Sequence, residues 1–196
     1  SGSIRIDALG AASNPSGTDR PFYFQNSTIR ASSGSITING TSRDTSGGAS
    51  TSYGVLLDGG TQITGGSGAI NITGTGGGGA NVQGIATTGT NTISSTSGNI
   101  SLTGSAGVGS TDVSGIDFAS VVNVTSNSGD ITLTGTGYGS GVGIKTASGG
   151  TINPGSGSSR LYYTADPATG ATAFSAAASA WPVPSTNLPL FWQDAA

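Results

Sequence analysis

Four residue types are missing from this sequence, which contains no histidine, cysteine, methionine or glutamate. Histidine, cysteine and glutamate commonly act as catalytic bases, nucleophiles and metal ligands, so acid-base or nucleophilic chemistry is poorly provided for. We therefore expect a protein that is not an enzyme and that holds no cofactor or metal. The lack of cysteine leaves the redox compartment undecided and is compatible with secretion.

Charge is scarce as well, with 8% charged residues and a net charge of -3. The five arginines and the single lysine are scattered and form no basic stripe, so nucleic acid is not an expected partner. No apolar run approaches the roughly 20 residues that a bilayer-spanning helix needs, and we expect no membrane insertion. The chain opens at Ser1 without a methionine or a signal sequence, which fits either a processed protein or a fragment.

The residues that are abundant recur with a period. The 36 glycines accompany serine and threonine, while isoleucine and valine occur at regular intervals, which favours a folded all-β body over disorder. A phrase of Ser-Gly followed by an apolar-x-apolar strand returns about every 31 residues. Its copies begin at Ser1, Ser33, Ser67, Ser97 and Ser128, and a degenerate sixth copy begins at Ser158, where Leu161 and Tyr163 take the apolar places.

Two further phrases keep the same period, so each repeat holds three short strands separated by glycine-rich turns. This is typical of one three-sided coil of a parallel β-solenoid, and residues 1–164 predict about six such coils. Alternate side chains face opposite ways, so Ile70 and Ile72 point inward while Asn71 and Thr73 point outward. Variable insertions such as residues 74–79 and 135–141 are expected at the corner that follows the Ser-Gly strand, where loops can carry function.

The tail, residues 165–196, leaves this period. It contains four prolines, both tryptophans and an alanine-rich patch that favours a short helix. Because the last coil of a solenoid exposes an apolar section and an unpaired edge, the tail is a candidate cap or inter-subunit connector through Trp181, Phe191 or Trp192.

The other end opens directly on a repeat, so its strand edge is expected to be bare unless another coil pairs with it. The residues that we expect at assembly surfaces are Ile4 and Ile6 at this end and Leu161 and Tyr163 at the other. The expected partners are copies of the same chain end to end, or further coils of a longer chain.

The "SGxIxIxG" rungs, the Gly-led second strands and the closing "SRLYYTADPATG" resemble the filamentous haemagglutinin type of bacterial adhesin, which is exported by two-partner secretion. The resemblance covers nearly all of residues 1–164, whereas the amino-terminal secretion domain of that family is missing. It implies a right-handed parallel β-helix on the bacterial cell surface. It also implies a role in adhesion or matrix building, with host or matrix glycans as partners.

Other functions rest on particular residues. Some β-helix enzymes act on polysaccharides with carboxylates on an outer face, so Asp58, Asp112 and Asp117 are candidates, although Asp117 and Lys145 also fit a simple ion pair between adjacent coils. Calcium binding through "GGxGxD" repeats is not indicated, since the phrase does not occur. Five Asn-x-Ser/Thr sequons could accept glycans, but chance sequons are expected in so Ser/Thr-rich a chain. They lie at Asn26, Asn39, Asn71, Asn99 and Asn123.

A regular array of outward polar residues predicts the alternative function, ice binding. The strands after each Ser-Gly align two rows with spacings of about 6.6 by 4.8 Å, and threonine arrays of this kind occur in ice-binding solenoids. Threonine is also simply a good exposed strand residue. The two rows are Thr37, Asn71, Ser101 and Thr132, and Asn39, Thr73, Thr103 and Thr134.

Overall fold

The computed structural model is a parallel β-solenoid, as the repeats predict. It describes residues 2–12, 17–45, 51–139, 141–146, 150–157, 159–164 and 174–176, the last two ranges as backbone only. Three parallel sheets run along the stack. Sheet A contains β1 (Ile4–Leu9), β5 (Ile36–Thr41), β8 (Ile70–Thr75), β11 (Ile100–Ser105), β14 (Ile131–Thr136) and β17 (Ser159–Thr164).

The other two sheets contain the two further phrases of the repeat. Sheet B contains β2 (Thr18–Asp19), β3 (Phe22–Gln25), β6 (Thr51–Asp58), β9 (Gly79–Thr88), β12 (Gly109–Phe118), β15 (Val142–Thr146) and β18 (Phe174–Ala176). Sheet C contains β4 (Thr28–Ala31), β7 (Gln62–Gly65), β10 (Asn91–Ser95), β13 (Val122–Ser126) and β16 (Thr151–Asn153).

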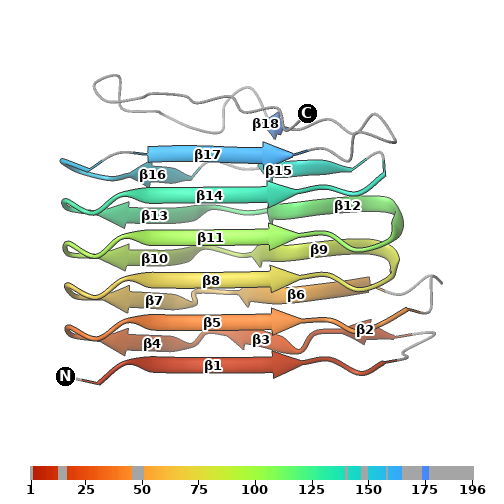
Figure 1. Ribbon diagram of the computed structural model, residues 1–196, viewed down its shortest axis with the longest axis horizontal. Helices are drawn as coiled ribbons and strands as arrows, with labels where there is room; N and C mark the ends of the chain where they lie inside the picture. The colour runs from red at the N-terminus through yellow and green to blue at the C-terminus, as the bar shows by residue number, and fades with distance from the viewer. Residues whose placement is uncertain are drawn as a thin grey trace.

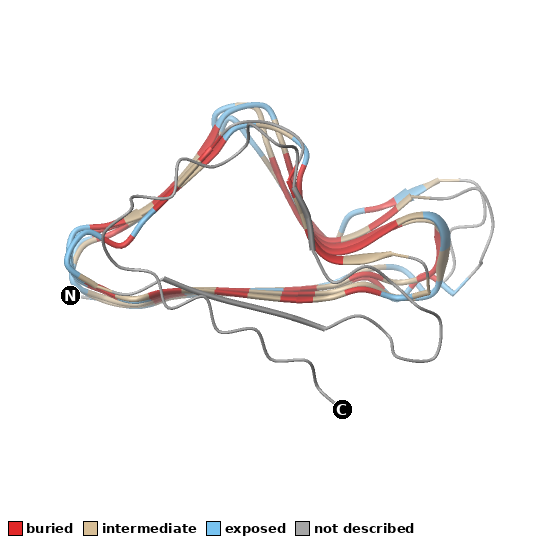
Figure 2. Cartoon of the chain, turned by 90° about the horizontal axis from the view of Figure 1, so that it is seen from above, coloured by how far each residue is buried: buried red, intermediate tan, exposed pale blue. Residues whose placement is uncertain are grey.

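The coil is right-handed. In Figure 1 the strands of sheet A lie in front and run from left to right as the chain climbs, and the chain returns behind them through sheets B and C. Seen from above, the coils superpose as a triangle with a lobe at one corner (Figure 2). The handedness agrees with the expectation that the family resemblance implied.

Columns of branched apolar side chains fill the triangle. Ile36, Ile70, Ile100 and Ile131 stack in register and are at most 1% exposed. Sheet B contributes Val55, Ile85, Ile116 and Ile144 in the same way, and sheet C contributes a single column that includes Ile63 and Ile93. A single rung has too few apolar residues to form a core, so burial comes from stacking.

The number of coils is smaller than predicted. The solenoid makes about four regular turns rather than six coils. In the first coil the sheet B side is broken into β2 and β3, and within the described residues the last coil consists of β17 and β18. Repeat counting overestimated the regular part because degenerate first and last copies still carry the phrase.

The sixth repeat also pairs two residues away from the predicted alignment. Leu161 pairs with Leu133 rather than with Ile131, Ser159 takes the place opposite Ile131, and Tyr163 pairs with Gly135. In the tail, Phe174–Ala176 forms β18, which pairs with β15. The rest of the alanine-rich patch, where the sequence favours a short helix, lies outside the described residues.

The lobe at the corner between sheets A and B exists because two glycine columns let backbones touch there. A Cβ on Gly74 in β8 or on Gly84 in β9 would lie within 3.0 Å of backbone atoms of the other strand. Beyond this constriction the insertions form the lobe, as expected, with their own buried residues. These include Val82, Val113 and a polar group in which Ser42 donates to Asp19 and Ser52 donates to Ser42.

Candidate functional site

The outer face of sheet A carries the predicted polar array. The register places Thr37, Asn71, Ser101 and Thr132 in one column and Asn39, Thr73, Thr103 and Thr134 in a second. A third column, Thr41, Thr75, Ser105 and Thr136, follows in the same register, and the sequence interpretation missed it. Its signal was present in the Thr or Ser that follows each strand glycine. Three columns without charge therefore extend from β5 to β14.

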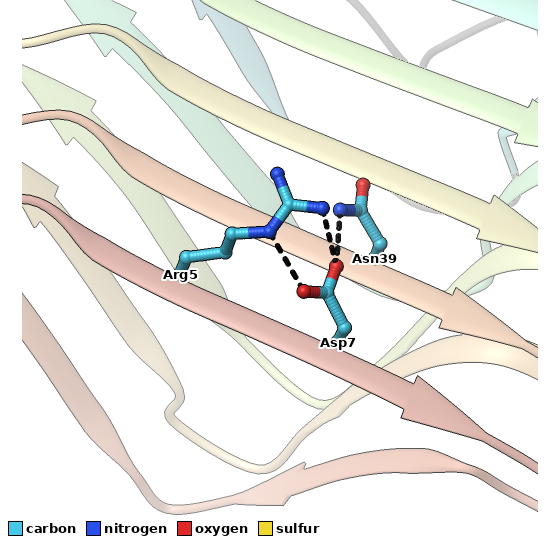
Figure 3. Close-up of polar contacts among 3 residues, drawn as sticks. All are labelled: Arg5, Asp7 and Asn39. Carbon is cyan, nitrogen blue, oxygen red and sulfur yellow. Dashed lines mark hydrogen bonds and ion pairs between the residues drawn. The ribbon is translucent and has the colours of Figure 1, made fainter.

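The first rung of this face is charged. Arg5 and Asp7 in β1 pair with Thr37 and Asn39 of β5. Arg5 Nε lies 2.7 Å from Asp7 Oδ2, and Asn39 donates to Asp7 Oδ1 at 2.6 Å (Figure 3). The Asn39 and Arg5 donors together lower the pKa of Asp7. The uncharged array therefore ends at a fixed ion pair on the edge strand.

The β1 edge is open in the described structure. Sheet A ends at β1, whose Ile4 N–H donates to Ser35 of the following coil. In a parallel ladder alternate residues bond to opposite neighbours, so the peptide groups of Arg5 and Asp7 face away from β5. Ile4, Ile6, Ala8 and Phe24 are only partly buried, whereas Ile36 and Ile38 one coil further are 0% exposed. This end exposes an apolar core section and unpaired backbone.

Of the predicted assembly residues at the other end, only the backbone positions of Leu161 and Tyr163 in β17 are described. Trp181, Phe191 and Trp192 lie outside the described residues. Their role as a cap or connector stays a prediction.

A charged cluster occupies the outer face of sheet B. Asp117 and Lys145 pair across adjacent coils, as the sequence predicted, and Lys145 Nζ lies 3.5 Å from Asp117 Oδ2. The same ammonium lies closer to Asp112, at 2.7 Å. Lys145 thus bridges two carboxylates from β12.

The environments of the two carboxylates differ. The Asp117 side chain is 7% exposed and its Oδ1 has no hydrogen-bond partner among the described residues, whereas the Asp112 side chain is 38% exposed. Burial raises the pKa of Asp117 to about 6, and Lys145 offsets only part of this effect. Burial opposes the charge of Lys145, but the bond to Asp112 and the proximity of Asp117 raise its pKa. Asp117 is therefore a costly buried carboxylate at neutral pH.

Asp58, the third carboxylate considered for catalysis, has structural partners. Its carboxylate accepts from Thr88 at 2.5 Å, Tyr23 at 2.8 Å and Gln25 at 3.1 Å. These hydrogen bonds lower the pKa of Asp58, and the bond from Thr88 has the largest effect. Asp58 therefore links three consecutive coils. It lies in β6 and is not paired with Asp112 or Asp117, which lie in β12.

Among the described residues no group of three or more acidic side chains could hold a metal ion. In the same ranges no helix is long and apolar enough to cross a bilayer. Of the five sequon asparagines, Asn39, Asn71 and Asn123 lie within strands, and Asn26 and Asn99 lie between strands. No family model, curated protein or solved structure matches this chain.

Proposed function

We propose that this chain is a segment of an extracellular, non-enzymatic β-solenoid rod with a structural or adhesive role. The observation that carries the proposal is the first coil, in which β1 has an open edge and Ile4 and Ile6 lie half-buried at the end of the core. A further coil would bury these side chains and pair the free peptide groups.

The repeat phrases support a location outside a bacterial cell, because they resemble the rods of filamentous haemagglutinin-type adhesins. The scarcity of charge and the absence of histidine, cysteine and glutamate support a role without catalysis. The long lateral faces would present polar side chains to host or matrix glycans. Incubation with a panel of polysaccharides tests this part, since cleavage would contradict it and retention of the glycans would support adhesion.

Coil addition can be tested directly. A copy of residues 67–96 fused ahead of Ser1 restores the spacing between consecutive Ser-Gly phrases. We expect the added coil to pair with β1, to raise the unfolding temperature and to slow hydrogen exchange at the Arg5 and Asp7 amides. A fusion with the same residues in scrambled order is the control. Unchanged exchange at these amides in the ordered fusion would refute the proposal.

Ice binding is a second candidate, favoured by the three columns on sheet A that the register aligns. Spacings of about 6.6 Å along a strand and 4.8 Å between coils make a flat lattice. Thermal hysteresis tests this function. If the lattice binds ice, Thr103→Lys at its centre should abolish the hysteresis, and Thr92→Lys on sheet C should leave it intact. A chain without hysteresis would exclude this candidate.

A further inference from the structure

The corner that precedes sheet A is closed by contacts between glycine backbones. One glycine per coil occupies this corner, two residues before the first paired residue of the strand. A Cβ on any of the last five would lie within 3.0 Å of the carbonyl oxygen of the corner glycine one coil earlier. The column is Gly2, Gly34, Gly68, Gly98, Gly129 and Gly157.

Gly2 differs from the other members. No atom of the described residues lies within 4 Å of a Cβ placed on Gly2, because no corner carbonyl precedes it in those residues. The fold of this chain therefore leaves space for a side chain at position 2. A glycine is needed there only when the carbonyl of another coil approaches from beyond β1.

Gly157 is the last member of the column among the described residues, and its carbonyl is of the required kind. Gly157 precedes Ser159 of β17 by two residues, as Gly2 precedes Ile4 of β1. Strands β17 and β1 have six residues each. In sheet B, β18 and β3 occupy equivalent positions at the two ends of the stack. One column of paired residues connects them, Phe174, Ile144, Ile116, Ile85, Val55 and Phe22.

We propose that the β1 edge receives the last coil of a second copy of this chain, with β17 beside β1, β18 beside β3 and the Gly157 carbonyl against Gly2. This inference rests on the rod proposed above and names its partner. The contact is head-to-tail and each added copy exposes a new β1, so assembly continues as a filament. Six strands of sheet A at about 4.8 Å give an axial repeat of about 30 Å.

The register of this contact places Arg160 of β17 at the position of Arg5 of β1. Like charges on neighbouring strands oppose pairing, and the Asp7 carboxylate bound to Arg5 offsets this repulsion. Arg5 and Asp7 are the charged side chains of β1, and they neutralise each other through their ion pair. Ile4 and Ile6 lie on the opposite face of the strand and become fully buried when a coil covers them.

Substitution of Gly2 separates assembly from folding. Gly2→Val should leave the unfolding midpoint unchanged, because its side chain enters open space, but should weaken association at least tenfold by blocking the incoming carbonyl. Sedimentation velocity and negative-stain electron microscopy of the full chain over a concentration series measure this. Thr92→Val, which places the same valine side chain on the lateral face of sheet C, is the control and should assemble like the unsubstituted chain.

Each outcome decides the inference. Filaments that Gly2→Val disrupts, with slowed exchange at the Arg5 and Asp7 amides of the assembled unsubstituted chain, support it. An unsubstituted chain that stays monomeric at all concentrations overturns it, whereas the ordered fusion still tests the rod independently. Filaments that survive Gly2→Val but vanish when the chain ends at Ala176 overturn it in favour of the tail as connector. If Gly2→Val lowers the unfolding midpoint, amide exchange in the unsubstituted filament decides, and fast exchange at Arg5 and Asp7 overturns the inference.

Discussion

Replacing Asp117 by asparagine should stabilise the protein at neutral pH. The carboxylate is buried on sheet B, and within the described part of the chain one of its oxygens has no hydrogen-bond partner. Burial raises the pKa of Asp117 from 3.8 to about 6. A difference of this size corresponds to about 3 kcal/mol of destabilisation once the group is fully ionised. Asparagine removes the charge, while Lys145 keeps its 2.7 Å contact with Asp112. We expect Asp117→Asn to gain about 1 to 3 kcal/mol at pH 7.5.

The gain should depend on pH in a definite direction. Because the folded pKa lies above the unfolded value, the stability associated with the protonated carboxyl is complete below pH 3.8 and is lost as the pH rises through about 6. The unsubstituted protein should therefore become less stable between pH 4.5 and pH 7.5, and Asp117→Asn should remove most of that slope. Urea denaturation at both pH values measures the two free energies of unfolding.

Asp7→Asn provides the control. The pKa of Asp7 is lowered, so its titration falls below this pH window and the variant should keep the slope of the unsubstituted protein. If Asp117→Asn is instead less stable than the unsubstituted protein at pH 7.5, the attraction between Asp117 and Lys145 outweighs the cost of burial. That result would refute the reasoning.

Two further substitutions test the stack. Leu102→Ala, at a 0% exposed core position, should lower the free energy of unfolding by about 2 to 5 kcal/mol in urea titrations, whereas Ser101→Ala on the outer face should change it by less than about 0.5 kcal/mol. Asn91→Ala should cost about 1 to 3 kcal/mol, because the buried Asn91 side chain donates to Thr88 at 2.8 Å and accepts from the Thr61 N–H one coil earlier. A cost below about 0.5 kcal/mol in the same titration would show that Asn91 does not join the coils.

The fold was predictable because stacked coils must repeat their inward residues. Ile70 and Ile72 alternate with outward Asn71 and Thr73, and the same alternation one period later defines both the strand and its neighbour. The degenerate last repeat was harder. Its alignment by Ser158 placed Leu161 opposite Ile131, but the backbone pairs Leu161 with Leu133, since corner length rather than the serine sets the register.

The candidate sites were predictable only where pairing alone brings residues together. Asp117 and Lys145 occupy equivalent positions in adjacent coils, so the repeat period alone predicted that they would be paired. The contact between Lys145 and Asp112 could not be predicted in this way, because these two residues are not paired in the register of β12 and β15. The buried group of Ser42, Ser52 and Asp19 was missed because it lies inside the lobe beyond the glycine constriction.

The two proposed functions place opposite demands on the charged first rung. A crystalline surface such as ice requires an uninterrupted lattice, which the uncharged columns of sheet A provide from β5 to β14. A head-to-tail filament would insert the Arg5 and Asp7 pair into those columns about every 30 Å, which breaks the lattice at each junction. An adhesive filament tolerates this interruption, because glycan contacts use local polar groups and repeat with each subunit. The ion pair on β1 therefore favours the structural and adhesive rod over an extended ice-binding surface.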